Sequence, residues 1–149
     1  MSPRRKALCV GLLVLLGFSL GCSEFVVIGI EPELAAAFGV SLARVGELIS
    51  VFALTYAVAT PLLALSTGRF RRFQLLVAYS VLFCLGNLVA AVATGFSALF
   101  VSRVLIGGVS GALLAVGVTY LPELVGPKRV SIAISVVYAA FSVAMVIST

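Results

Sequence analysis

The stretch from Leu8 to Ile30, LCVGLLVLLGFSLGCSEFVVIGI, decides the fold class, because Glu24 is its only charged residue. A soluble core helix interrupts its apolar run with polar residues at almost every turn. A helix rises ~1.5 Å per residue, so this stretch is long enough for the hydrocarbon core of a bilayer, which is about 30 Å thick. The stretch therefore predicts a transmembrane helix.

Four more stretches have the same character: Val45 to Leu65, Phe73 to Ala93, Phe96 to Leu121, and Val130 to Thr149. Of the 149 residues, 62% are apolar and 10% are charged, which is too little charge to keep a globule in water. The alternating pattern of a membrane barrel is absent, and helices satisfy their backbone amides internally. Residues 1–149 are therefore predicted to form an all-α polytopic membrane protein with about five transmembrane helices, embedded in the lipid bilayer.

The connection between the first two stretches is mixed in character and is expected to lie at the membrane interface. Pro32 and Gly39 are interpreted as helix breakers, and Ser41 as the cap of the second helix.

The basic residues form short clusters between the apolar stretches, with no basic face, so a nucleic-acid partner is excluded despite the net charge of +5. An amino terminus in the cytoplasm leaves Arg44 alone outside. It places eight basic residues inside: Arg4, Arg5, Lys6, Arg69, Arg71, Arg72, Lys128 and Arg129.

Glu24 and Arg103 are the charged residues inside the apolar stretches. A charge within a span costs at least ~2.5 kcal/mol, so each calls for a functional explanation. Both are expected roughly 9 Å below the same membrane boundary. We hypothesise that they face one interior cavity, where the Glu24 carboxylate carries a proton and the guanidinium tunes its proton affinity. The alternative is a static ion pair that fixes helix packing.

Three uncharged residues are also singled out within the spans. Asn87 is expected at a similar depth, where it would contact substrate or hold two helices together. Gly107 and Gly111 follow Arg103 at intervals of four residues, and this GxxxG spacing lets another helix approach closely.

The short connection between the second and third stretches contains Arg69, Arg71 and Arg72. We weigh a gating role against a purely topological one equally. There is no histidine, no nucleophile paired with a base and no phosphate-binding loop, and the cysteines Cys9, Cys22 and Cys84 have no metal-ligand spacing. No enzyme activity, cofactor or metal is therefore expected.

Taken together, these segments resemble the drug and sugar efflux branch of the major facilitator superfamily, over essentially the whole chain. The resemblance is carried by Ser23–Phe25, Pro32–Ala35, Phe38–Ser41, Pro61–Ala64 and the arginine-and-glycine motif Ser102–Gly111. In that family the motif's arginine is linked to proton coupling, and the resemblance gives this role to Arg103.

Two departures from the family pattern limit what is carried over. In the cytoplasmic motif Gly68 replaces the family's aspartate and Arg71 its glycine, while Arg69 and Arg72 match, so no gating role is assigned to Gly68. The chain also ends at Thr149, about where exporters of the family carry a glycine-proline motif. It is therefore expected to be part of an amino-terminal six-helix bundle that lacks its carboxy-terminal partner.

The resemblance implies a proton-coupled exporter of small organic molecules, such as a sugar or a chloramphenicol-type drug, in the bacterial inner membrane. Five spans supply less than one bundle of an alternating-access transporter, so this chain alone should not transport. The alternatives are a small transporter that builds its pathway by oligomerising, and a non-transporting scaffold or product of truncation.

Overall fold

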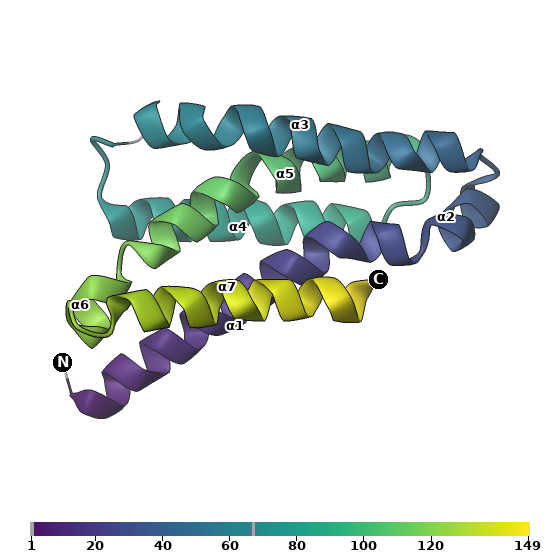
Figure 1. Ribbon diagram of the computed structural model, residues 1–149. Coiled ribbons are helices and arrows are strands. Elements are labelled where there is room, and N and C mark those ends of the chain that lie inside the picture. The colour runs from purple at the N-terminus through teal and green to yellow at the C-terminus, as the bar shows by residue number, and fades with distance from the viewer. Residues whose placement is uncertain (1, 67) are drawn as a thin grey trace. The chain divides into compact units, whose positions relative to one another are not determined.

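The computed structural model describes residues 2–66 and 68–149, and these residues form helices and turns without a strand (Figure 1). The helices are α1 (Pro3–Gly29), α2 (Glu31–Phe38), α3 (Leu42–Ser66), α4 (Arg72–Ala91), α5 (Phe96–Val118), α6 (Leu121–Val125) and α7 (Val130–Ser148).

Five of the helical segments are long and apolar enough to cross a membrane, which confirms the predicted fold class. They are Pro3–Gly29, Leu42–Ser66, Arg72–Ala91, Phe96–Val125 and Val130–Ser148. Many large apolar side chains point outward along them, with Leu65 84% and Val146 78% exposed. Such a surface suits lipid, because lipid tails are as apolar as these side chains.

The helix ends differ from the predicted spans where proline or polar residues were misjudged. α1 begins at Pro3, so the basic residues Arg4, Arg5 and Lys6 belong to its first turns. The fourth span was predicted to run to Leu121, but α5 ends at Val118. Pro122 has no N–H to donate to the helical hydrogen bonds of α5. It lies instead in the first turn of the short helix α6, which begins at Leu121.

The connection after α1 contains the helix α2, which was not predicted. Pro32 was interpreted as a breaker, but it lies in the first turn of α2, where its missing N–H has no helical partner to lose. Gly39 does end the helix, in the left-handed conformation with φ 62°. Its N–H donates to Ala36 O and that of Val40 donates to Ala35 O, at 3.4 and 3.0 Å, which is a Schellman motif.

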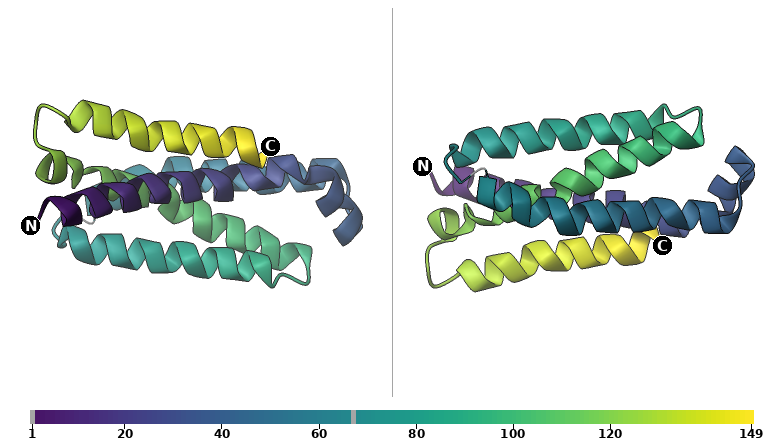
Figure 2. Two further views of the ribbon diagram at one scale, coloured as in Figure 1. Left: turned by 90° about the horizontal axis from the view of Figure 1, so that it is seen from below. Right: turned by 90° about the horizontal axis from the view of Figure 1, so that it is seen from above.

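The chain divides into two compact units, and the first consists of Met1–Val26 and Leu114–Thr149. In this unit α1 and α7 lie side by side, as Figures 1 and 2 show. Gly17 meets Val137, and Gly21, four residues later, meets Phe141. Because both numbers rise together by four, the two helices run parallel.

The second unit is Val27–Leu113 and contains α2, α3, α4 and most of α5. Gly107 and Gly111 of α5 pack on α3, and Gly86 of α4 packs on Ile106 of α5. Near the first turns of α3 a buried cluster of Val27, Val45, Leu48 and Leu99 is covered by partly buried residues of α2 and its flanks: Leu34, Ala35, Phe38 and Val40.

Candidate functional site

Glu24 and Arg103 lie well inside their helices, as predicted, but in different units. Glu24 belongs to α1 in the first unit and is half-buried; Ser23 before it is 8% exposed. Arg103 belongs to α5 in the second unit and is 3% exposed. That the two side chains share one cavity stays a prediction.

Arg103 is almost completely buried, so its charged guanidinium has little access to solvent. Its neighbour Ser102 is fully buried and donates to Leu99 O of the same helix, at 2.6 Å. A guanidinium held in apolar surroundings requires hydrogen-bond or charge partners, and such residues in membrane helices line interior pathways far more often than lipid.

Asn87 lies on α4 in the second unit and is partly buried. Its side-chain amide donates to Phe83 O of the same helix, at 2.9 Å. One N–H group of the amide is therefore used within its own helix. That Asn87 contacts substrate stays a prediction.

Gly107 and Gly111 lie against α3, on the face of α5 that also carries Arg103. A Cβ atom on Gly107 would lie 2.6 Å from Phe52 O and in contact with Thr55 Oγ1. A Cβ atom on Gly111 would lie 2.9 Å from Tyr56 Cζ and in contact with Thr60 Oγ1. The residue numbers of the contact partners increase together along α5 and α3, so the two helices run parallel and are in close contact over this turn.

Gly107→Ala is expected to weaken the packing of α5 on α3. The new methyl group would overlap the Phe52 backbone, which cannot move as a side chain can, and such overpacking costs about 1–3 kcal/mol. The measurement is the midpoint of thermal unfolding of the protein in detergent.

Gly108→Ala is the matched control, because nothing lies within 4 Å of a Cβ at Gly108. It is expected to leave stability unchanged or to raise it by up to ~1 kcal/mol through helix propensity. Equal effects of the two substitutions would contradict the close contact.

The basic connection after α3 is exposed at Arg69, Arg71 and Arg72. Arg72 is the first residue of α4 and Arg71 precedes it. Cations interact unfavourably with the dipole at a helix N-terminus. That this basic connection has a gating role stays a prediction.

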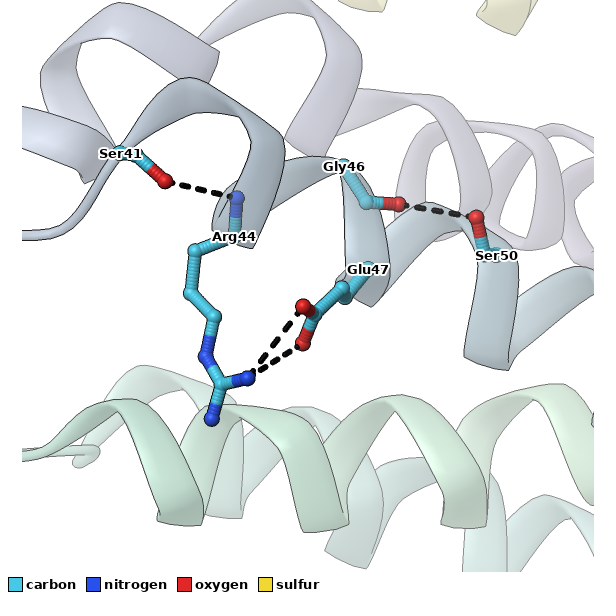
Figure 3. A network of polar contacts seen from close by, with 5 residues as sticks. All are labelled: Ser41, Arg44, Gly46, Glu47 and Ser50. Atoms are coloured by element: carbon cyan, nitrogen blue, oxygen red, sulfur yellow. Dashed lines mark hydrogen bonds and ion pairs between the residues drawn. The ribbon is translucent and has the colours of Figure 1, made fainter.

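The first turns of α3 carry a small polar network that includes Arg44 (Figure 3). Ser41 Oγ accepts the Arg44 N–H at 3.3 Å, which confirms Ser41 as the helix cap. The Arg44 guanidinium pairs with Glu47 at 2.9 Å and lies 5.4 Å from the ring centroid of Phe96 at the start of α5. Arg44 thus links the first turns of α3 and α5, a role that its place in a polar connection did not reveal.

Sequence reasoning missed Gly17 and Gly21, which have the same GxxxG spacing as the pair on α5. A Cβ on Gly17 would lie 2.9 Å from Val137 O, and one on Gly21 would lie 2.6 Å from Phe141 O. The spacing was visible in the sequence, but no charged residue drew attention to it.

Within residues 2–66 and 68–149 no group of three His, Cys, Asp or Glu side chains is placed to hold a metal ion. In the first unit the apolar stretches carry the carboxylate of Glu24, and in the second unit they carry the guanidinium of Arg103 and the amide of Asn87. Such groups can bind and orient a small molecule, and a carboxylate can also take up and release protons.

Residues 13–149 match the family model of the Major Facilitator Superfamily. The chain is 29% identical over 136 residues to the uncharacterised MFS-type transporter YbcL of Bacillus subtilis (strain 168), covering 91% of this chain and 35% of that protein.

Two further relatives carry more descriptive names. The inner membrane transport protein YdhP of Escherichia coli (strain K12) is 28% identical over 127 residues, which cover 85% of this chain and 33% of YdhP. The chloramphenicol resistance protein of Streptomyces lividans is 30% identical over 128 residues, which cover 86% and 33%. The chain spans about a third of the length of these relatives.

Proposed function

Because this chain belongs to the major facilitator superfamily, we propose that it forms part of a proton-coupled secondary transporter that exports small organic molecules. Its family is one of transporters, and its five apolar helices make it a multi-pass membrane protein. Proton coupling, the direction of transport and the substrate are the parts of this function that we propose.

The observation that carries the proposal is the presence of Glu24 and Arg103 within the apolar stretches of α1 and α5. A carboxylate within a membrane helix costs free energy, so such residues usually have a function. A carboxylate can take up a proton from one side of the membrane and release it to the other. A nearby cation would favour the ionised form of the carboxylate, and binding of a proton would neutralise the carboxylate. Glu24 is therefore proposed as the proton carrier and Arg103 as the group that tunes it.

Transport would proceed by alternating access, in which two helical bundles rock about a site near the middle of the membrane. The chain spans about a third of its relatives, so a carboxy-terminal part is proposed to supply the second bundle and half of the substrate site. Asn87 on α4 is proposed as a substrate contact.

The proposed location is the bacterial inner membrane, with the amino terminus in the cytoplasm. Eight basic residues then lie on the cytoplasmic side and Arg44 on the other, as the positive-inside rule requires. The printed name of the relative YdhP, an inner membrane transport protein, supports the location.

The proposed substrate is a sugar or a drug of the chloramphenicol type. The name of the Streptomyces relative supports the drug, and largely apolar walls suit an amphipathic molecule held by a few hydrogen bonds.

The direct test measures uptake by everted membrane vesicles from cells that express the full-length protein. With the vesicle interior made acidic, radiolabelled chloramphenicol or arabinose should accumulate, and a protonophore should abolish the accumulation. Vesicles without the protein are the control. Inserted protein that accumulates neither compound under a pH gradient would contradict this function and favour a non-transporting scaffold.

A further inference from the structure

The hydroxyl of Thr60 on α3 faces α5 at the position of Gly111. A Cβ atom on Gly111 would contact Thr60 Oγ1 and lie 3.0 Å from Thr60 Cβ. The oxygen therefore lies directly over the glycine Cα, where it can accept a weak Cα–H hydrogen bond. Its own O–H donor is not used by that contact.

Thr60 differs in its hydrogen bonding from many of the other hydroxyls in the described helices. Serine and threonine in helices ordinarily donate to a carbonyl three or four residues earlier. Nine hydroxyls within the helices or at their ends do so, namely those of Ser50, Thr55, Ser66, Ser102, Ser110, Thr119, Ser135, Ser142 and Thr149.

Thr55 provides the closest comparison, because it lies on the same helix and also against a glycine of α5. Its hydroxyl contacts the Cβ position of Gly107, yet it donates to Val51 O at 2.8 Å and lies 2.9 Å from Phe52 O. Thr60 Oγ1 is buried and has no hydrogen-bond partner in the part of the chain that the structure describes. Packing against glycine alone therefore does not explain the difference.

The next residue, Pro61, removes a second local hydrogen bond. A proline inside a helix has no N–H to donate to the carbonyl four residues earlier, which here is that of Ala57. In membrane helices such freed groups are satisfied by neighbouring side chains or ordered water, because an unmet polar group costs several kcal/mol in hydrocarbon. This turn of α3 therefore has both a hydroxyl donor and a carbonyl acceptor to satisfy.

We propose that Thr60 is a binding point for one oxygen atom that accepts its hydrogen bond at the contact of α3 with α5. The oxygen comes either from an internal water molecule or from a hydroxyl or carbonyl group of the transported molecule. The second source rests on the proposed transport function, and the first does not.

The test compares Thr60→Val with Thr55→Val in the full-length protein, and Thr60→Ser with both. Valine keeps the branched shape of threonine and replaces the hydroxyl with a methyl group, and Thr55→Val replaces in the same way a hydroxyl that is satisfied within its own helix. Two quantities are measured: the midpoint of thermal unfolding in detergent, and the KM for chloramphenicol and arabinose in everted vesicles.

If water is the partner, Thr60→Val lowers the unfolding midpoint by about 2–4 °C relative to Thr55→Val, the shift for one hydrogen bond, and KM stays unchanged. If the transported molecule is the partner, the midpoint does not fall and KM rises about fivefold. Thr60→Ser keeps wild-type values in either case.

The inference is overturned if Thr60→Val is at least as stable as Thr55→Val and leaves KM unchanged. The stability comparison needs no transport, so it separates this inference from the transport function. If the wild-type protein moves neither probe, a lowered midpoint still supports the water site, and an unchanged one overturns the inference.

Discussion

Replacing Glu24 with glutamine is expected to abolish proton-driven accumulation of substrate, reducing it to the level seen without a pH gradient. Glutamine keeps the size of the side chain, but its amide cannot take up and release a proton. Movement of substrate down its own gradient should persist, because the binding surface is otherwise intact. Both rates are measured in the same everted vesicles, with an acidic interior for the first and no pH gradient for the second.

Glu33→Gln is the control, since Glu33 is exposed on α2 and lies outside the long apolar helices. It is expected to leave both rates unchanged. Intact proton-driven accumulation in Glu24→Gln would show that Glu24 is not the proton carrier.

A double substitution distinguishes the proton carrier from a static ion pair. If Glu24 and Arg103 only neutralise each other, Glu24→Gln combined with Arg103→Gln leaves no uncompensated charge, and transport should recover relative to either single variant. If Glu24 carries the proton, the double variant stays uncoupled.

The second large effect is expected at Gly21, where any side chain would disrupt the packing of α1 on α7. A Cβ atom there would lie 2.6 Å from Phe141 O and 2.8 Å from Ala144 Cβ, and neither atom can move aside without shifting a helix. Gly21→Ala should cost about 1–3 kcal/mol, and Gly21→Leu should prevent stable folding. The measurements are the midpoint of thermal unfolding and the yield of monodisperse protein in detergent.

Gly11 provides the matched control on the same helix, because nothing lies within 4 Å of a Cβ at that position. Gly11→Ala should be neutral or stabilising by up to ~1 kcal/mol, and Gly11→Leu should still give folded protein. If Gly21→Leu folds as well as Gly11→Leu, α1 and α7 do not pack as described.

The long apolar helices were predictable because nearly every residue of a membrane span has to be compatible with a lipid environment. A run such as Leu8 to Ile30 has few other uses, and one charge within it is conspicuous. Helix ends were harder, since they depend on local hydrogen bonding. Pro32 starts a helix rather than breaking one, and Pro122 ends α5 before Leu121.

The candidate site was predictable only where charge or spacing singled out a residue. Glu24 and Arg103 stand out in any reading of the sequence. Thr60 does not, because hydroxyls are common in membrane helices and the sequence does not reveal which of them fails to bond its own backbone. Gly17 and Gly21 were overlooked since small residues at that spacing also occur without a helix partner.

The contact between α1 and α7 also has a consequence for the biogenesis of the protein. Gly17 and Gly21 emerge from the ribosome first among the close-packing glycines, but their partners Val137 and Phe141 are synthesised only after three intervening spans. Until α7 enters the bilayer, the glycine face of α1 lacks this partner. The packing of α1 on α7 therefore forms only at that point.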